Sequence, residues 1–356
     1  MSEAATGNGA HGALGSKDMR AALRGALQRV ASVRLGVVGD VMLDRFLVGF
    51  SQRVSREAPV VVLKHDHTLE VAGGAANTAV NARTLGAEVV VLGCVGEDAP
   101  ASELKRLFCD AGIAPSHQRL HPVVDWPTTC KVRILGGLHH STVQQLVRLD
   151  YEEPLDTLQA EAAADALAAQ LREVWASLDA CVISDYGLGV VCEPLLAEVR
   201  RLREARPIPV TVDAHLLRAP LFAGFTAATP NVAEVEATLA EPGLAEKPAQ
   251  LAKRAVRLRE TLGLEALLVT RGKYGMLLLD SLGETPEPLE IPVYGSDEVA
   301  DVTGAGDTVI ATYTAALATG ATHEVAARLA NVAGGLVVMK RGTATASLEE
   351  VQAALA

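Results

Sequence analysis

The stretch that decides the fold is Asp301-Val302-Thr303-Gly304-Ala305-Gly306-Asp307-Thr308, late in the chain. The residues that follow, Val309 to Leu317, are rich in alanine and other apolar side chains. They are too apolar to be solvated and too few to cross a membrane, so they predict a buried helix. Gly304-Ala305-Gly306 then forms the loop that feeds the helix N-terminus, where backbone N–H groups lack partners and the dipole is positive. Two glycines let this backbone close round an anion.

Asp307 lies within the predicted anion site. A carboxylate there would repel a bound phosphate unless it takes up a proton. The pattern therefore indicates a phosphoryl-transfer site in which Asp307 accepts the proton of an attacking hydroxyl. The alternative is an Asp N-cap on a helix bounded by glycine. The sequence has no G-x-x-x-x-G-K-[ST] motif and no G-x-G-x-x-G after an early strand, which argues against a P-loop enzyme and a dinucleotide-binding dehydrogenase.

The composition is that of a globular protein. The 356 residues are 49% apolar and 21% charged, enough for one large α/β domain or two smaller ones. A net charge of −11 without a basic stripe argues against nucleic acid as the main partner. It leaves an anionic substrate open, because a local cluster of Lys and Arg can reverse the field in one cleft. No segment reads as a signal peptide or a membrane span.

The five cysteines show neither a C-x-x-C motif nor metal-ligand spacing. Several fall in apolar, strand-like runs. This usage predicts buried, reduced thiols and a cytoplasmic protein.

The chain divides into a tail at residues 1–15, expected to be disordered, and one domain at 16–356. The first strand, Val33 to Gly39, runs into Asp40 and Asp44, where α/β sheets present ligand-binding groups. Asp44 suits sugar hydroxyls, although a turn or cap role fits its spacing equally well. After Tyr151, helices alternate with strands that end in polar residues. This order predicts a parallel sheet with its ligand site along one edge.

Two excursions, at about 46–64 and 128–150, each contain two short strand-like runs. Four short strands outside an α/β core predict a small sheet that acts as a lid, closing over substrate and excluding water. Its apolar residues, such as Phe46, Val48, Val60 and Val62, exceed what one thin layer can bury. We therefore expect a homodimer through the lid.

Nearly the whole chain from Val33 onward resembles the ribokinase-like (PfkB) carbohydrate kinases. Two motifs carry the family resemblance, the Asp301–Thr308 stretch and Gly73-Gly74-Ala75-Ala76-Asn77. Ser55–Pro59 (S-R-E-A-P) and Gln144–Asp150 (Q-Q-L-V-R-L-D) resemble the family members that phosphorylate D-glycero-β-D-manno-heptose 7-phosphate at C1. The resemblance implies a ribokinase-like α/β fold, a mostly parallel sheet flanked by helices with a small β-sheet lid, and ATP-dependent phosphorylation of a sugar hydroxyl.

The resemblance also implies roles for individual residues. Asp307 would be the base, with the backbone of Gly304, Ala305 and Gly306 as its anion hole. Sugar hydroxyls would be bound by Asp44, Gly73, Gly74 and Asn77, and the nucleotide by Asn231, Thr270, Arg271, Gly272 and Asn331.

Two ions are implied as well. Asn231 and Glu234 would organise Mg²⁺ through water, which suits an ion that keeps much of its hydration shell. Asp301 is a candidate ligand for a monovalent cation such as K⁺.

An acceptor phosphate would need cationic partners. Lys131 and Arg133, alternate residues on a lid strand, are the candidates, with solvated surface charge as the alternative.

The chain departs from the heptose-kinase pattern at two positions. That pattern has a lysine after S-D-Y-x, where this chain has Leu188, and D-P-K-G, where this chain has Asp213-Ala214-His215-Leu216. The loss of two cations implies weaker catalysis, another acceptor sugar, or compensation by His215 or Arg218. A kinase for another, even unphosphorylated, sugar and a binding regulator without turnover are the rival hypotheses. The sequence contains no H-x-G-H segment, so we expect a separate nucleotidyltransferase to act downstream.

Overall fold

The computed structural model describes residues 14–137, 143–217, 220–281, 287–295, 300–340 and 342–356. Most of the predicted tail, residues 1–13, lies outside the described residues. Leu14 is buried in the main core. The packed core therefore includes Leu14, which lies within the segment 1–15 that was expected to be disordered.

The described residues form a main sheet of nine strands in the order β13-β12-β11-β10-β9-β8-β1-β4-β5. Neighbouring strands pair in parallel except at the β11–β12 and β12–β13 contacts, which are antiparallel. The predicted mostly parallel sheet is confirmed. The antiparallel strands β12 and β13 at one edge were not predicted. The strands are β1 (Arg34–Gly39), β4 (Glu88–Val95), β5 (Gln118–Pro122), β8 (Ala180–Asp185), β9 (Val210–Ala214), β10 (Ala227–Ala228), β11 (Ala266–Thr270), β12 (Met276–Asp280) and β13 (Leu289–Ile291).

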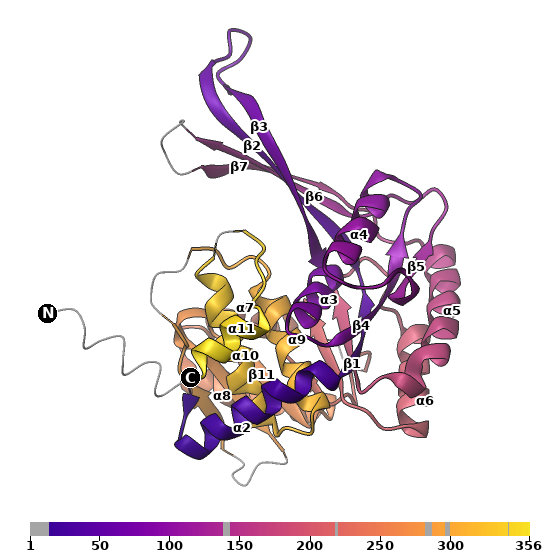
Figure 1. The fold of residues 1–356 in the computed structure, drawn as a ribbon, viewed down its shortest axis with the longest axis vertical. Helices are drawn as coiled ribbons and strands as arrows, with labels where there is room; N and C mark the ends of the chain where they lie inside the picture. The colour runs from indigo at the N-terminus through magenta and orange to yellow at the C-terminus, as the bar shows by residue number, and fades with distance from the viewer. Residues whose placement is uncertain (1–13, 138–142, 218–219, 282–286, 296–299, 341) are drawn as a thin grey trace, which may run out of the picture.

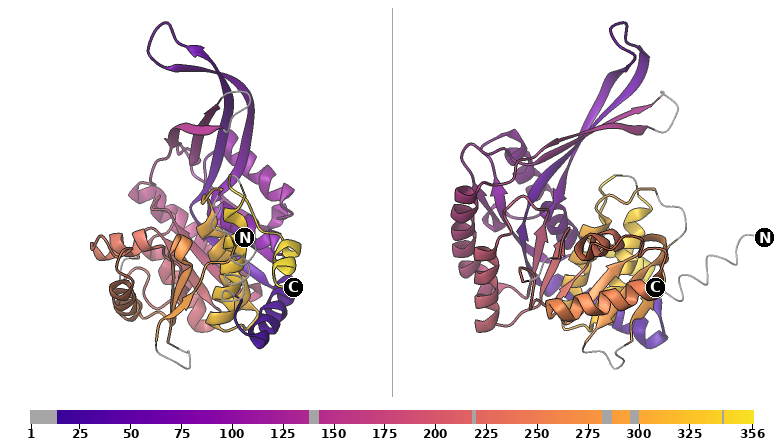
Figure 2. Two further views of the ribbon diagram at one scale, coloured as in Figure 1. Left: turned by 90° about the vertical axis from the view of Figure 1, so that its left-hand side faces the viewer. Right: turned by 180° about the vertical axis from the view of Figure 1, so that it is seen from behind.

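Helices cover both faces of this sheet (Figures 1 and 2). One face carries α2 (Lys17–Arg29), α3 (Ala75–Thr84), α4 (Ala99–Asp110), α9 (Ala305–Ala318), α10 (His323–Val338) and α11 (Leu348–Ala354). The other carries α5 (Thr157–Val174), α6 (Glu193–Ala205), α7 (Val232–Leu239) and α8 (Pro248–Leu262).

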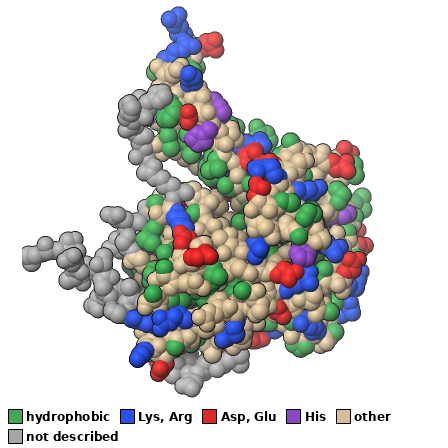
Figure 3. Space-filling view, in the orientation of Figure 1, with side chains coloured by type: hydrophobic (Ala, Val, Ile, Leu, Met, Phe, Trp, Pro, Cys, Tyr) green, Lys and Arg blue, Asp and Glu red, His purple; other side chains and the backbone are tan. Residues whose placement is uncertain are grey.

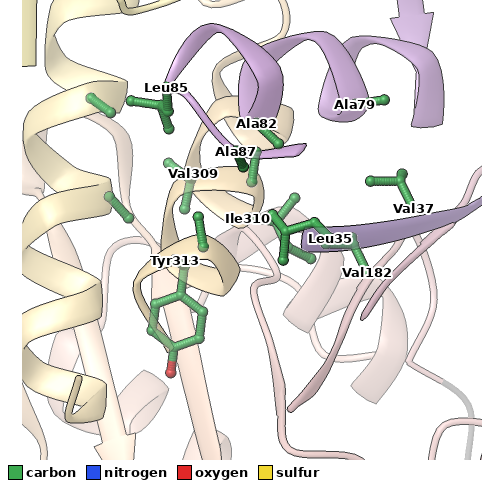
Figure 4. Packing of buried hydrophobic residues seen from close by; sticks show 14 of the residues in the cluster. Leu35, Val37, Ala79, Ala82, Leu85, Ala87, Val182, Val309, Ile310 and Tyr313 are labelled. Carbon is green, nitrogen blue, oxygen red and sulfur yellow. The ribbon is translucent and has the colours of Figure 1, made fainter. Parts of the chain in front are cut away.

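Each face has its own core because successive strand residues point to opposite sides. Val37 belongs to the first core and Val38 to the second. Figure 4 shows the first core, in which Val309, Ile310 and Tyr313 of α9 lie against the sheet and α3. The predicted buried helix after the glycine loop is thus confirmed, and its burial fixes the position of its N-terminus.

A second sheet projects from the body as an arm (Figures 1 and 2). It has the order β3-β2-β6-β7 and consists of β2 (Val41–Val54), β3 (Val61–Gly74), β6 (Cys130–Gly137) and β7 (Gln144–Tyr151). The predicted segments were about 46–64 and 128–150. The first hairpin is longer than predicted, since β2 starts directly after β1 and β3 continues to α3. The connection at 138–142 lies outside the described residues.

Other predictions concern thiols and membranes. All five cysteines are free, with Cys94, Cys130 and Cys181 buried and Cys109 exposed. Across the described ranges, no helix combines the length and the apolar character that a bilayer crossing requires.

Gly39 joins the two sheets. It ends β1, and β2 begins two residues later. A Cβ at residue 39 would lie 1.9 Å from the Ser184 carbonyl oxygen of β8, at a backbone φ of +154°. The neighbouring Asp40 N–H donates to that same oxygen at 3.1 Å. The junction therefore has no space for a side chain, because the strand pairing occupies it.

We predict that Gly39→Ala lowers the free energy of unfolding by at least about 3 kcal/mol, since the clash involves backbone that cannot move cheaply. The matched control is Gly25→Ala in α2, where the added carbon would make only an ordinary 3.5 Å contact with Arg29. This variant should be neutral or stabilised by about 0.5–1 kcal/mol. Urea unfolding of both variants checks the prediction, and equal effects would contradict it.

Candidate active site

A cavity of about 110 Å³ lies at the carboxyl edge of the main sheet. It is formed by the residues that follow β8, β9, β10 and β11 and by the first turn of α9. These are the strand ends for which the sequence predicted a shared ligand edge. The cavity is lined by Asp185, Tyr186, Asp213, Ala214, His215, Thr229, Asn231, Glu234, Thr270, Gly304, Gly306 and Asp307.

Asp307 stands on the first turn of α9, and its side chain is almost fully buried. Asn77 Nδ2 donates to its Oδ2 at 2.7 Å. Thr78 Oγ1 and the Tyr186 hydroxyl donate to its Oδ1 at 3.1 and 3.0 Å. A carboxylate oxygen has about two lone-pair sites, so Oδ1 is fully used and Oδ2 keeps one site for another donor.

The pKa of Asp307 is raised to about 6. Burial is the main cause, and the Asp44 carboxylate adds to the rise. The hydrogen bonds from Asn77, Tyr186 and Thr78 act in the opposite direction, because they favour the ionised form. Asp307 is thus ionised at neutral pH while remaining basic enough to receive a hydroxyl proton.

The glycines before α9 have separate roles. Gly304 is the N-cap in the left-handed region, at a φ of +77°, and a Cβ there would lie 2.6 Å from the Asn77 amide nitrogen that holds Asp307. Gly306 lines the cavity, and nothing lies within 4 Å of where its Cβ would be. The space in front of the helix N-terminus therefore suits an anion. The Ala305 N–H, part of the predicted anion hole, already donates to the Val302 carbonyl at 3.2 Å.

Asn77 was predicted to bind sugar hydroxyls. It is buried, and besides its bond to Asp307 its Oδ1 accepts from Asn81 Nδ2 at 3.0 Å. Its Nδ2 keeps a second N–H and its Oδ1 a second lone pair, so the contact with a sugar hydroxyl stays a prediction. The structure thus gives this polar residue in an Ala-rich helix a different contact, the support of the carboxylate.

Tyr186 and Thr78 are contacts of Asp307 for which the sequence predicted no role. Tyr186 directly follows β8 at the ligand edge, and that position was a usable signal. Thr78 stands beside Asn77 within a helix, and nothing in its local sequence distinguishes it from a packing residue.

Carboxylates dominate the rest of the cavity. Burial raises the pKa of Asp213 well above its usual value, and the nearby Asp307, Glu234 and Asp185 carboxylates add to this. Burial and Asp185 also raise the pKa of Asp40, just behind the cavity, to about 7. This concentration of negative charge suits cations or groups that arrive with cations.

Asn231 and Glu234 form the capping box of α7. Asn231 Oδ1 accepts from the Glu234 N–H at 2.9 Å, and Glu234 Oε2 accepts from the Asn231 N–H at 2.8 Å. Both line the cavity, where the second oxygen of Glu234, Oε1, lies 3.4 Å from His215 Nδ1. Among the described residues, no group of three or more His, Cys, Asp or Glu is placed to hold a metal directly. The donors present fit a hydrated Mg²⁺, bound through water.

The two departures from the heptose-kinase pattern lie in different surroundings. Leu188 is buried and outside the cavity lining, and its N–H donates to Asp40 Oδ2 at 3.3 Å. His215 lines the cavity, with Nδ1 3.4 Å from Glu234 Oε1 and its ring edge-on to Tyr186 at 4.9 Å. The hydrogen bond to Glu234 raises the pKa of His215. Arg218 lies outside the described residues.

The predicted nucleotide-binding residues are only partly brought together. Thr270 and Asn231 line the cavity and form an isolated bridge between their backbones. Arg271 Nη2 is turned to the Tyr274 carbonyl and Glu290, at 3.0 and 3.2 Å. Gly272 follows with a φ of +54°. Asn331 is buried in α10, where Nδ2 donates to the Pro292 carbonyl at 2.8 Å.

Asp301, the predicted cation ligand, organises the loop before α9. Its Oδ1 accepts from the N–H and hydroxyl of Thr303 at 3.0 and 2.8 Å, and its Oδ2 accepts from the Gly342 N–H at 3.1 Å. These bonds lower its pKa despite partial burial, which acts the other way. One lone pair of Oδ2 is left for a cation.

One face of the small sheet carries Asp44, Lys131 and Arg133. Asp44 lies within β2 and is buried, so its alternative role as a turn or cap residue is wrong. Arg133 Nη1 donates to Asp44 Oδ1 at 2.6 Å. A Cβ on Gly73 would lie 2.9 Å from Asp44 Oδ2, so this glycine gives the carboxylate its space. Lys131 Nζ lies 5.8 Å above the Tyr186 ring and 3.5 Å from Glu152.

Comparison with known proteins gives a consistent result. The model of the pfkB family of carbohydrate kinases matches residues 34–350. The chain is 40% identical to the bifunctional protein HldE of Shewanella piezotolerans over 92% of its own length and 65% of that protein. It is 41% identical to the HldE protein of Hahella chejuensis over 90% of its length and 63% of that protein. It thus spans less than two thirds of these relatives.

Solved structures show the same fold. Arabidopsis thaliana ribokinase complexed with ribose and ATP has a TM-score of 0.66 at 20% identity, covering 91% of this chain and 98% of that one. Phosphofructokinase-2 from Escherichia coli in complex with potassium has a TM-score of 0.69 at 18% identity, covering 91% and 97%. The ribokinase-like fold predicted from the sequence is confirmed.

We predict that Asp307→Asn keeps nucleotide binding but lowers kcat for phosphoryl transfer at least about a hundredfold, as expected when a general base is lost. In the unmodified protein, the rate should rise with pH through about 6, since only the ionised carboxylate accepts a proton. Asp156→Asn is the control, because Asp156 caps α5, where asparagine caps equally well. Near-normal turnover of Asp307→Asn would remove Asp307 from the mechanism.

Proposed function

The chain belongs to the pfkB family of carbohydrate kinases, and from this premise we propose that it transfers a phosphoryl group from ATP to C1 of D-glycero-β-D-manno-heptose 7-phosphate. The product would be the 1,7-bisphosphate. The carbohydrate kinase activity is that of the family, and the choice of acceptor is the proposal.

The observation that supports phosphoryl transfer to a sugar hydroxyl is the environment of Asp307. A buried carboxylate with three neutral donors, one open lone pair and a pKa of about 6 suits deprotonation of a sugar hydroxyl. The N-terminus of α9 begins beside it. An acceptor hydroxyl at Oδ2 and a phosphoryl group before the helix would be in line for transfer.

The chain's own groups supply positioning and charge stabilisation. Thr270 and Asn231 would contact the nucleotide phosphates, and Asn231 with Glu234 would hold Mg²⁺ through water. Bound Mg²⁺ supplies neutralisation of phosphate charge. The carboxylates that line the cavity support this assignment, since ATP would otherwise meet repulsion from Asp213 and Asp185. K⁺ at Asp301 is a further proposal.

The heptose phosphate is supported by the sequence elements of the small sheet. The Q-Q-L-V-R-L-D element is β7, and its strand pairs with β6, which carries Lys131 and Arg133. Both cations have carboxylate partners, Arg133 with Asp44 at 2.6 Å and Lys131 with Glu152 at 3.5 Å. The pair of Lys131 is longer and more exposed, so Lys131 is the better candidate for the acceptor phosphate. Lys131 also lies closest to the cavity of this pair, above the Tyr186 ring.

Two rivals keep specific support. Among the described residues, the cavity lining has His215 but no lysine or arginine, and this favours another acceptor or weak turnover. A binding regulator would need no base, whereas Asp307 here retains three hydrogen-bond donors. We therefore favour an active kinase.

An ATP-consumption screen over free and phosphorylated heptoses, hexoses and pentoses tests the proposal. We expect the highest kcat/KM for the heptose 7-phosphate. A preference for a free sugar would overturn the acceptor assignment, and a lack of turnover with every sugar would favour the regulator.

For a phosphorylated acceptor, we predict that Lys131→Ala raises KM roughly tenfold or more, because a charge-assisted contact is worth about 1.5–3 kcal/mol and each 1.4 kcal/mol is a factor of ten. KM for ATP should stay nearly constant, and any activity on free sugars should be unchanged or improved. Lys64→Ala is the matched control, since Lys64 is exposed on the outer part of β3. An unchanged KM in Lys131→Ala would contradict the phosphate contact and indicate that Lys131 is an ordinary solvated surface charge.

We also propose a cytoplasmic homodimer formed through the small sheet. Phe46 and Val48 are buried within one copy, so they do not require a partner as the sequence suggested. Val147 and Leu149 of β7 are about half exposed and lie on the face opposite Lys131. Figure 3 shows apolar side chains along this arm. A second copy would cover them.

Light scattering at micromolar concentration should therefore give about twice the 37.2 kDa chain mass. Leu149→Glu should shift the population to the monomer, because it places a charge in the apolar contact. Leu158→Glu is the control, as Leu158 is exposed on α5, away from the small sheet. A fully active monomer in the unmodified protein would contradict the dimer.

A further inference from the structure

We propose that Tyr186 is a positioning residue for the catalytic base, holding Asp307 so that Oδ2 alone meets the acceptor hydroxyl. This inference rests on the proposed function, in which Asp307 takes the hydroxyl proton.

The geometry around Asp307 separates its two oxygens. The Tyr186 hydroxyl and Thr78 Oγ1 both donate to Oδ1, at 3.0 and 3.1 Å, and occupy its two acceptor sites. Oδ2 accepts from Asn77 alone among the hydrogen bonds of the described residues. Without Tyr186, the carboxylate could rotate or accept the substrate at either oxygen, which loosens the geometry that transfer requires.

Tyr186 is itself held from several sides. Its N–H donates to Asp40 Oδ2 at 2.7 Å. Its ring occupies the space beside Gly74, where a Cβ would lie 3.2 Å from the ring. His215 meets the ring edge-on, and Lys131 of the small sheet lies above it. The residue therefore connects the base with the junction of both sheets.

The charges around the base explain why a neutral donor matters. The Asp44 carboxylate from β2 opposes the ionisation of Asp307, and the charge of Asp307 in turn raises the pKa of Asp213 on β9. Asn77 and Thr78 of α3 and Tyr186 favour ionisation as donors. Burial and the Asp307 charge raise the pKa of Tyr186 well above 10, so the hydroxyl keeps its proton throughout the working range.

Tyr186→Phe removes one donor without removing the ring. The pKa of Asp307 should then rise further, because the ionised form loses a hydrogen bond. We expect the midpoint of the single-turnover pH profile to move up by roughly one unit. The rate should fall about fivefold at pH 6 and less than about twofold at pH 8.5, following the ionised fraction of the base.

Two further variants make the result specific. Thr78→Val removes the other Oδ1 donor and should shift the midpoint in the same direction. Tyr313→Phe is the matched control, since this buried tyrosine bonds to His323 at 2.7 Å within the core. It should lower stability while leaving the midpoint in place. A wild-type midpoint in Tyr186→Phe would overturn the inference.

A second measurement needs no turnover. The folded pKa of Asp307 lies above its unfolded value, so its contribution to stability declines as pH rises and becomes constant above the folded pKa. The difference in unfolding free energy between chains with Asp307 and Asp307→Asn should level off near pH 6, and at higher pH in the Tyr186→Phe background. Failure of every sugar in the screen would refute the proposed kinase function, whereas an unmoved levelling point would refute the role of Tyr186.

Discussion

The site depends on keeping one carboxylate ionised in a place that disfavours charge. Asp307 loses its water because α9 is buried between the sheet and its neighbouring helices. Asn77, Thr78 and Tyr186 replace part of that water with fixed donors, so the pKa stops near 6. A fully solvated Asp would be a weaker base, and one buried without donors would remain protonated at neutral pH. The packing around α9 and the three donors together set the intermediate pKa of Asp307.

Sequence patterns predicted the features that depend on local order. The apolar run after Gly306 gave the buried helix, and the polar residues after β8, β9 and β11 gave the ligand edge. Both follow from periodicity and from the rule that parallel strands end together. The short strand β5 and the antiparallel β12 and β13 were not predicted, since their pairing is decided by neighbours distant in sequence. The extent of the first hairpin was likewise set by strand pairing.

The site was predicted less completely because its key contacts are long-range. Asp307 and its donors are separated by 121 to 230 positions along the chain. No local pattern indicates that Asn77 and Tyr186 meet there. The resemblance predicts a sugar contact for Asn77, which stays a prediction, and did not indicate the hydrogen bond from Asn77 to Asp307. For Asn231 and Glu234, the capping box is a pattern that the local sequence contains. The binding of Mg²⁺ that we propose for them depends on the cavity, which elements distant in sequence form.

The junction of the two sheets explains why so many site residues are constrained together. Gly39, Asp40 and Gly74 fit the ends of β1, β2 and β3 against Ser184 and Tyr186, with backbone contacts that leave no room for side chains. A movement of the β2–β3 hairpin relative to the main sheet would therefore change the contacts at this junction. Because Tyr186 also donates to Asp307, such a movement would alter the environment of the base. A substrate contact on the small sheet can therefore affect the proton affinity of Asp307 through Tyr186.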